Sequence, residues 1–292
     1  MKNILFICLL ILSSEIWSDT VQVPYKYDES LIQLNATHYI GNDSKSIALI
    51  LHGTRGHQNL ELIKSLANSF LENNIDSLTV NLSYGIDNRE NNFLPCDIEH
   101  KHSKSKSINE IELWLKYLKS KGYQKIFLIG HSRGGLNIIQ FFEEFKGSEK
   151  NLIESIFLIA PVSDEYTDLK KYHMIKNNIN IDQLVDGPNE LLTIDFLNCP
   201  NGKVSKTSFL DYFKISNKRS GKDGSLLGNL LETNAKVFVI TGSEDIIVPN
   251  TYRRVQALNK RNIELIIVDE ADHFFRDLYF DDLIEIIIEK VS

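Results

Sequence analysis

The chain has 292 residues, of which 42% are hydrophobic, 24% charged and 10% aromatic. This ordinary globular composition excludes collagen, a long coiled coil and a largely disordered chain. The formal net charge is −7, with 32 basic and 39 acidic side chains. Because no basic run stands out, the composition argues against a nucleic-acid partner and against an anionic membrane surface.

The first 18 residues have the layout of a secretory signal peptide. Lys2 gives a positive start, an uninterrupted apolar run follows from Ile4 to Leu12, and serines come next. The run is too short for a transmembrane helix, which needs roughly 20 residues. We therefore expect cleavage after Ser18, export to the periplasm or the medium, and no stable membrane insertion. The alternative is that this segment is a buried first strand.

Two cysteines, Cys96 and Cys199, remain once residues 1–18 are removed. In an oxidising compartment such a pair favours a disulfide, which for a loop of this length stabilises the fold by about 4.7 kcal/mol in the chain-entropy model. The alternative is two unrelated buried thiols. Cys96 with His100 and His102 also resembles a metal-ligand cluster, but a disulfide would remove the thiolate, so we expect no metal.

From residue 45 onward, short apolar strands alternate with amphipathic helices. The strands are expected at residues 46–51, 77–82, 125–130, 155–160, 236–241 and 264–268. The helices are expected at 59–73, from Ser107 to about 118, from about 134 to 142, near 251–260 and near 275–290. This alternation predicts an α/β fold in which a mostly parallel central sheet has helices on both faces. A capping-box pattern, Ser107 with Glu110, predicts the start of the second helix.

Residues 163–232 interrupt this alternation with polar, irregular sequence and short helical patches. Ligands bind at the carboxyl edge of open α/β sheets, so an insertion over that edge is expected to form a cap or lid. The alternative is a surface excursion without a role. The sequence thus predicts one domain over residues 19–292 with a cap at about 163–232.

The strongest chemical signal is the segment Gly130-His131-Ser132-Arg133-Gly134, a G-x-S-x-G placed directly between a strand and a helix. A nucleophilic serine needs a very sharp turn there, and the flanking glycines let strand and helix approach closely enough to make it. The following helix also aims its N–H groups and positive dipole end at the serine. The alternative is a glycine-rich turn with an idle serine.

A serine nucleophile needs a base, and the base needs an acid that orients it. Asp245 follows strand 236–241, and His273 follows strand 264–268, so both are expected at the same sheet edge as Ser132. The chain order Ser, Asp, His is the order that hydrolases with a G-x-S-x-G elbow use. Rival acids for the orienting role are Glu244, Asp269 and Asp272.

Two backbone N–H groups are expected to bind the oxyanion of a tetrahedral intermediate. One belongs to Arg133, the residue after the nucleophile, and the other comes from the loop after strand 46–51. There Thr54 is the expected donor, with Gly53 as the alternate. The side chains of Arg55 and Arg133 flank this pocket, where they either receive an anionic part of a substrate or, more commonly, form ion pairs.

Together these segments resemble the α/β-hydrolase superfamily. The resemblance rests on Leu51-His52-Gly53, on Gly130 to Gly135, on Asp245 with Val248-Pro249, and on His273, and it spans roughly residues 45–290. More narrowly, Gly53-Thr54 with Gly56-His57, and Cys96 with His100-Lys101-His102, are similar to uncharacterised exported bacterial members. The resemblance implies a Ser-His-Asp triad, no cofactor, and most commonly hydrolysis of a carboxylic ester.

The sequence therefore favours a serine hydrolase that acts on a small-molecule ester through an acyl-enzyme. Thioesterases and amidases or peptidases share the scaffold and remain alternatives. A non-catalytic binding protein is a further alternative, because fold alone does not fix function.

Overall fold

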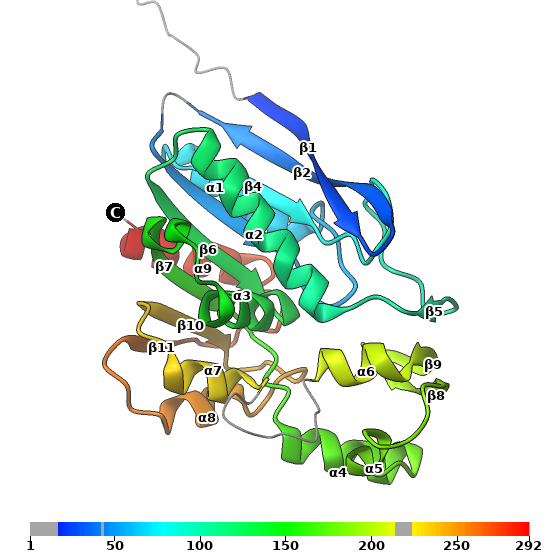
Figure 1. Ribbon diagram of the computed structural model, residues 1–292. Helices are drawn as coiled ribbons and strands as arrows, with labels where there is room; N and C mark the ends of the chain where they lie inside the picture. The colour runs from blue at the N-terminus through cyan, green and yellow to red at the C-terminus, as the bar shows by residue number, and fades with distance from the viewer. Residues whose placement is uncertain (1–16, 42–43, 214–223, 292) are drawn as a thin grey trace, which may run out of the picture.

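The computed structural model describes residues 17–41, 44–213 and 224–291 (Figure 1). The predicted signal peptide lies outside these ranges, except for Trp17 and Ser18, which begin the first strand. An eight-stranded sheet runs through the molecule in the order β1-β2-β4-β3-β6-β7-β10-β11. Its strands are β1 (Trp17–Tyr27), β2 (Ser30–Ile40), β3 (Ser46–Leu51), β4 (Asp76–Asn81), β6 (Lys125–His131), β7 (Ile153–Ile159), β10 (Val237–Gly242) and β11 (Ile263–Val268).

The six strands from β4 to β11 along this order are parallel to one another, as the alternation of strands and helices predicts. Strand β2 runs in the opposite direction: it is antiparallel to β4 and to β1, with which it forms a long hairpin at one edge of the sheet. This hairpin is the segment that precedes the α/β alternation in the sequence.

Helices cover both faces because the central strands are apolar on both faces. The helices around the sheet are α1 (Glu61–Glu72), α2 (Lys104–Ser120), α3 (Arg133–Glu144), the short η1 (Ser148–Leu152), α7 (Leu226–Glu232), α8 (Thr251–Gln256) and α9 (Leu278–Val291). In β3, Ile47, Leu49 and Leu51 pack into one core with α2, α3 and α7, whereas Ala48 and Ile50 pack into another with α1 and α9. Such a sheet, buried on both sides, exposes its functional groups only at the strand ends.

Helix α2 begins earlier than the sequence predicts. Its N-cap is Ser103, whose hydroxyl accepts a main-chain N–H of the first turn, so the predicted capping box at Ser107 is wrong. Glu110 does not reach back to the helix start. Its side chain is fully buried and accepts two hydrogen bonds from Ser83, a residue that follows β4. The donors are the Ser83 N–H (2.8 Å) and the Ser83 hydroxyl (2.6 Å). The Glu110 carboxylate therefore bonds to a residue distant in the sequence instead of to the start of its own helix.

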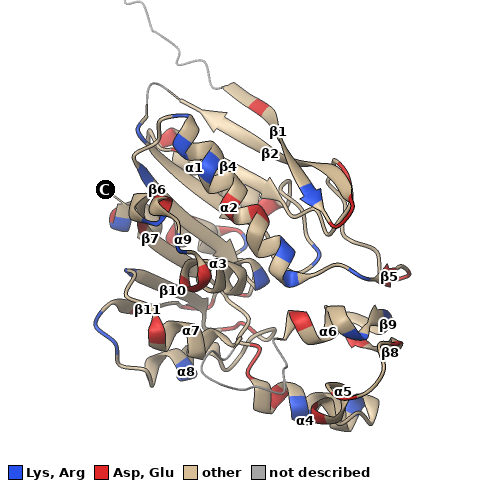
Figure 2. Ribbon diagram, in the orientation of Figure 1, with Lys and Arg blue, Asp and Glu red and all other residues tan. Residues whose placement is uncertain are grey.

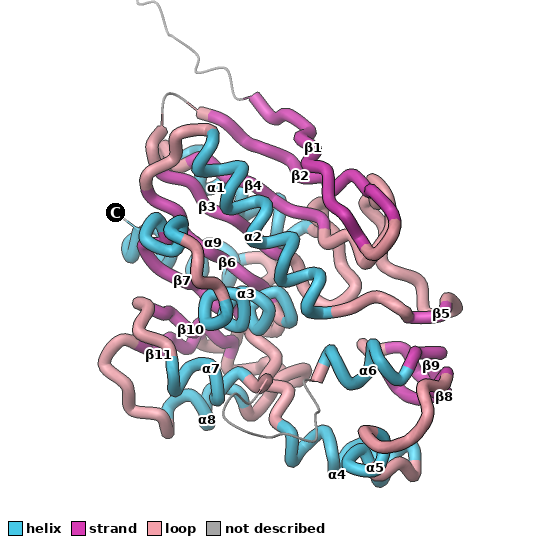
Figure 3. Tube along the Cα trace, viewed as in Figure 1, coloured by secondary structure: helices cyan, strands magenta, loops and turns pink. Residues whose placement is uncertain are grey.

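Residues 163–232, here called the insert, leave the sheet after β7 and return to it at β10. The described part contains α4 (Tyr166–Asn177), α5 (Ile181–Leu184), β8 (Leu191–Phe196), β9 (Cys199–Ser205), α6 (Lys206–Tyr212) and α7. Strands β8 and β9 join the two-residue β5 (Glu99–His100) in a second, three-stranded sheet beside helices α4 to α6 (Figure 3). This sheet was not anticipated from the polar sequence. It has its own apolar core, which includes Ile194, Phe196 and Phe209.

Lys and Arg residues are interspersed with Asp and Glu along helices α2 and α4 (Figure 2), whereas β2, β3 and β10 contain none of these four residue types. Among the helices within the described ranges, none is both long enough and apolar enough to cross a bilayer.

Candidate active site

Ser132 stands at the junction of β6 and α3, in a backbone conformation with φ 55° and ψ −120°. This region is costly for a residue with a Cβ, so the surrounding structure must hold it in place. The Ser132 N–H donates to the carbonyl of Ile159 (2.8 Å), and its own carbonyl accepts the N–H of Gly135 (3.1 Å). The serine is thus fixed at the carboxyl end of the parallel strands, at the N-terminus of α3.

The two motif glycines are explained by backbone contact. A Cβ on Gly130 would come within 2.5 Å of the carbonyl group of Gly134. A Cβ on Gly134 would come within 2.5 Å of the carbonyl oxygens of Leu51 and His52. Since main-chain atoms cannot move aside cheaply, only glycine lets β6, α3 and the end of β3 meet this closely.

The structure brings Asp245 and His273 together. Asp245 follows β10, His273 follows β11, and Asp245 Oδ2 lies 2.8 Å from His273 Nδ1. Asp245 Oδ1 accepts the main-chain N–H groups of Ile247 (2.8 Å) and Val248 (2.9 Å). Both side chains are almost fully buried. None of the rival acids makes this contact; Asp272, for example, pairs with Arg276.

The environment keeps Asp245 ionised. Burial by itself raises the pKa of this carboxyl group, but the hydrogen bond from His273 and those from the two N–H groups outweigh burial and lower it below its usual value. An ionised Asp245 accepts a hydrogen bond from His273 Nδ1–H, which fixes the orientation of the imidazole ring.

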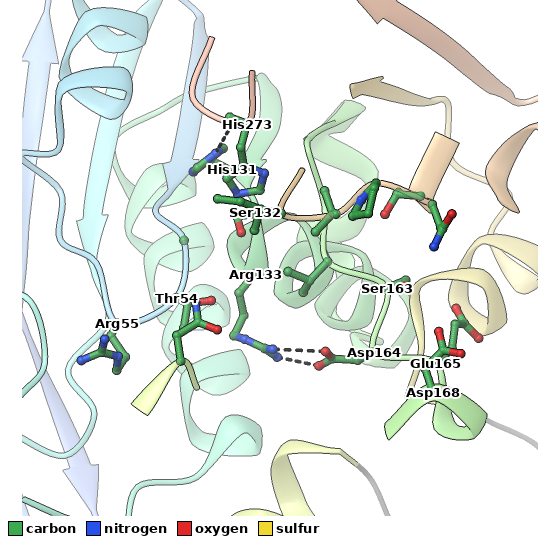
Figure 4. A pocket seen from close by; sticks show the side chains of 18 of the residues that line it. Thr54, Arg55, His131, Ser132, Arg133, Ser163, Asp164, Glu165, Asp168 and His273 are labelled. Carbon is green, nitrogen blue, oxygen red and sulfur yellow. Dashed lines mark hydrogen bonds and ion pairs between the residues drawn. The ribbon is translucent and has the colours of Figure 1, made fainter. Parts of the chain in front are cut away.

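Ser132 and His273 line one cavity of about 510 Å³. Figure 4 shows Ser132 beside His131 and His273 at one end of this cavity, with an ion pair between Arg133 and Asp164 further along it. Among the described residues no hydrogen bond joins the Ser132 hydroxyl to the His273 imidazole. Catalytic hydrogen bonds often tighten only when substrate binds.

His131, the variable residue inside the G-x-S-x-G motif, supports this arrangement. Its Nε2–H donates to the main-chain carbonyl of His273 (2.9 Å), and the two rings lie 4.9 Å apart. Burial, followed by the proximity of His273, lowers the pKa of His131 to about 4, so its ring is neutral near pH 7. Sequence reasoning gave this residue no role, because its partner is 142 residues away.

The loop after β3 is held by two hydrogen bonds to one main-chain carbonyl. His52 Nδ1–H donates to the Gly53 carbonyl (2.9 Å), and the Gly56 N–H donates to the same oxygen (3.1 Å). Because the peptide bond is trans, the Thr54 N–H points away from that carbonyl. Thr54 and Gly53 both line the cavity, and within the described ranges the Thr54 N–H has no hydrogen-bond partner.

His52 is a rigid support for this loop. It is completely buried, and its Nε2 accepts the N–H of Leu82 (3.2 Å) while Nδ1–H donates to Gly53. Burial, together with the positive charge of Arg89, lowers the pKa of His52 to about 3. An imidazole that is neutral near pH 7 and has both nitrogens bonded fixes the orientation of the peptide group between Gly53 and Thr54.

The side chain of Arg133 forms an ion pair, the more common of the two outcomes considered from sequence. Its two terminal nitrogens contact both carboxylate oxygens of Asp164, at 2.6 and 3.1 Å. The pair is largely buried, and Asp164, at the start of the insert, has φ 46°. Burial alone would lower the pKa of Arg133, but the Asp164 carboxylate raises it. This bidentate pair ties the insert to the first turn of α3.

Arg55 and the disulfide hold the other side of the cavity. The predicted Cys96–Cys199 disulfide is present, with 5.3 Å between the Cα atoms. The Arg55 guanidinium donates to the carbonyls of Leu94 (2.6 Å) and Leu197 (2.9 Å), each two residues before a bridged cysteine. The loop that carries Thr54, the segment after β4 and the β8–β9 turn are therefore fastened together at one place.

The other candidate metal ligands form a hydrogen-bonded chain instead. His100 Nδ1 lies 3.1 Å from His102 Nε2, and His102 Nδ1 lies 2.7 Å from the Tyr212 hydroxyl. Cys96 is oxidised, so its sulfur is not a free thiolate. Burial, with the proximity of His100, lowers the pKa of His102 to about 3. These residues pack the insert against the main body.

Comparisons of the sequence with known proteins give a single partial match. A family described as "Protein of unknown function (DUF1749)" matches residues 101–222. No curated protein matches the chain.

Solved structures match over nearly the whole chain. Est1E from Butyrivibrio proteoclasticus is 17% identical, covers 92% of this chain and 97% of its own, and has a TM-score of 0.62. A hydrolase from Agrobacterium vitis S4, described as putative, is 14% identical, with 94% and 99% coverage and a TM-score of 0.63. The esterase Pf2001 from Pyrococcus furiosus is 17% identical, with 93% and 91% coverage and a TM-score of 0.57. The chain therefore has the α/β-hydrolase fold.

Proposed function

We propose that this protein is a serine hydrolase that cleaves carboxylic esters of small molecules through an acyl-enzyme. The observation that carries the proposal is the hydrogen bond between Asp245 and His273 at the cavity that also contains Ser132. An imidazole whose Nδ1 is held by a buried carboxylate has its Nε2 available as a base. The strained serine at a helix N-terminus is the matching nucleophile.

In this mechanism the Ser132 oxygen attacks the ester carbonyl carbon while His273 Nε2 takes the hydroxyl proton. Asp245 keeps the imidazole in the correct tautomer and stabilises its charged form. The bond to the alcohol oxygen then breaks, and His273 returns the proton to that oxygen. Water attacks the acyl-enzyme with the same proton transfers, which releases the carboxylic acid and restores Ser132.

The negative oxygen of the tetrahedral intermediate is assigned to two main-chain donors, the N–H groups of Arg133 and Thr54. The Arg133 N–H belongs to the first turn of α3, whose N–H groups have no partner within the helix and whose dipole favours negative charge. The Thr54 N–H is oriented by the contacts of His52 and Gly56 to the preceding carbonyl. Removal of one such donor typically costs about 2.7–4 kcal/mol of transition-state stabilisation.

We assign the insert the role of a cap. It contributes Asp164, Tyr172 and Asn198 to the cavity wall. The fold also occurs in esterases, and one structure of Est1E, 19% identical to this chain, contains ferulic acid. These neighbours favour a small organic ester as the substrate of the present protein.

We also place this activity outside the cytoplasm. A disulfide persists in oxidising compartments and is uncommon in cytosolic proteins. Export directed by residues 1–18 predicts a mature chain that begins near Asp19, which fractionation and N-terminal sequencing of the expressed protein would check.

The direct test is hydrolysis of p-nitrophenyl acetate by the wild type and by Ser132→Ala, with circular dichroism to show that the variant is folded. We expect the variant to lose at least 10³-fold in kcat. Equal rates would overturn the proposal. A panel of matched esters, thioesters and amides, compared by kcat/KM, then separates an esterase from a thioesterase or an amidase.

A further inference from the structure

A second cavity, of about 370 Å³, lies next to the one that contains Ser132. It is enclosed between the start of α1 and the segment that follows His273. Six of its eleven lining residues are apolar. The apolar lining residues are Leu60, Leu62, Ile63, Phe274, Phe275 and Phe280.

The two cavities share a wall. Leu60, His131 and Phe274 line both of them. The Phe274 ring lies 5.1 Å from the ring of His273 and 5.8 Å from that of His131. Phe274 is 39% exposed, so it is not locked in a close-packed core. A substrate group that passes Leu60 and Phe274 would therefore move from the side of the catalytic base directly into the second cavity.

The position of the proton donor in the proposed reaction indicates which part of a substrate would occupy the second cavity. The departing alcohol oxygen takes its proton from His273, so the alcohol portion must leave on the His273 side. The opposite end of the first cavity carries the Arg133–Asp164 ion pair, as Figure 4 shows. A largely buried ion pair thus lies at the far end of the first cavity, and a chamber with six apolar lining residues lies on the side where the alcohol departs.

We propose that the second cavity is the binding site for the alcohol portion of the ester, and that this portion is an apolar alkyl chain. The inference rests on the proposed function and adds the substrate class to it. Each methylene group buried from water should raise kcat/KM about fourfold until the chamber is filled. The acyl portion, which faces the polar end, should show no comparable gain with length.

The experiment uses two series of esters with the purified protein. The first series contains acetates of methyl to octyl alcohols, and the second contains methyl esters of acetic to octanoic acids. We expect kcat/KM to rise several-fold per methylene in the alcohol series and to stay nearly constant in the acyl series. A flat alcohol series, or a rise confined to the acyl series, would overturn the inference.

A matched pair of variants on α1 locates the effect. Ser65 lines the second cavity, and Ser69 lies one helical turn further on, outside it. Ser65→Trp should fill the chamber and lower the ratio of kcat/KM for octyl acetate to that for methyl acetate at least tenfold. Ser69→Trp should leave this ratio within twofold of the wild type. Equal ratios in the two variants would contradict the assignment.

A second variant, which enlarges the chamber, tests the site even if Ser65→Trp does not fold. Phe280→Ala widens the chamber, so the alcohol length at which kcat/KM peaks should shift to longer chains; an unchanged peak counts against the site. The ester series separates failure of the proposed function from failure of the subsite. If the wild type cleaves neither series, the proposed function fails and the subsite with it, whereas cleavage without dependence on alcohol length defeats the subsite alone.

Discussion

The Nε2–H of His131 donates a hydrogen bond to the main-chain carbonyl of His273, although the two residues are 142 positions apart in the chain. His131 immediately precedes the proposed nucleophile, and His273 is the proposed base. One side chain therefore links the turn that carries Ser132 with the loop that carries the imidazole. This link sets the relative position of two groups that must meet during proton transfer.

Loss of this link should impair turnover more than binding. His131→Ala should lower kcat by about tenfold or more with little change in KM, because a small misplacement of a catalytic group is costly. His131→Gln keeps an N–H donor and should recover part of the loss. Steady-state kinetics on one ester would check both variants, and a wild-type kcat in His131→Ala would refute this positioning role.

Substitution of Asp245 should lower catalytic turnover without a change in side-chain size. Asp245→Asn keeps the size of the side chain but favours the wrong imidazole tautomer, so we expect kcat to fall by about 10⁴-fold. The matched control is Glu244→Gln, which changes the exposed acid next to it in sequence. That control should retain kcat within about threefold. Comparable activity in the two variants would mean that another group orients His273.

The disulfide should stabilise the fold strongly because it closes a loop of 103 residues. In the chain-entropy model such a loop contributes about 4.7 kcal/mol, and measured values commonly lie between 2 and 5. In urea titrations, the double variant Cys96→Ser/Cys199→Ser should lower the free energy of unfolding by about 2–5 kcal/mol. A difference below about 1 kcal/mol would contradict the expectation.

Arg55, which lies beside the disulfide, should affect activity because it holds the loop that carries Thr54. Arg55→Ala removes two hydrogen bonds that join the Thr54 loop to its neighbours. We expect kcat to fall about tenfold, and Arg55→Lys to restore little, because an ammonium group cannot span two carbonyls as a guanidinium does. Full activity in Arg55→Ala would show that the loop keeps its conformation without this contact.

Glu110 gives a pH-dependent prediction. Burial raises the pKa of this carboxyl group to about 7, from an ordinary value of 4.5. Between these pH values the folded protein holds a proton that the unfolded chain has lost. The contribution of Glu110 to the free energy of unfolding therefore falls as the pH rises from 4.5 to 7.

The variant Glu110→Gln removes this titration and leaves the buried histidines unchanged. Its free energy of unfolding minus that of the wild type should rise by about 3 kcal/mol from pH 4.5 to 7 and then level off, because one pKa unit corresponds to about 1.4 kcal/mol. Chemical denaturation at several pH values measures the difference. A difference that stays constant with pH would mean that Glu110 titrates normally in the folded state.

The sequence predicted the sheet and its edge because both depend on local patterns. Apolar strands of five or six residues between amphipathic helices define a doubly covered sheet, and residues just past parallel strands must share one edge. That is why Ser132, Asp245 and His273 could be placed together. The disulfide was predicted because export and an even cysteine pair support each other.

Predictions that depend on partners distant in the sequence were either wrong or not made. The pattern of Ser107 with Glu110 is that of a capping box, but Ser83 captures the carboxylate from another loop. Asp164 as the partner of Arg133 has no sequence signature. The strand β8 did have one, since its buried residues alternate at Leu192, Ile194 and Phe196, and a closer count of period-two positions would have found it.

The most direct test of the central claim is covalent labelling of Ser132. A fluorophosphonate reacts with a serine hydroxyl only when a base and oxyanion donors activate it. Intact mass spectrometry and peptide mapping of the labelled wild type should find one adduct per chain, on Ser132, and none in His273→Ala. An unlabelled wild-type protein, or an adduct on a different residue, would contradict the account.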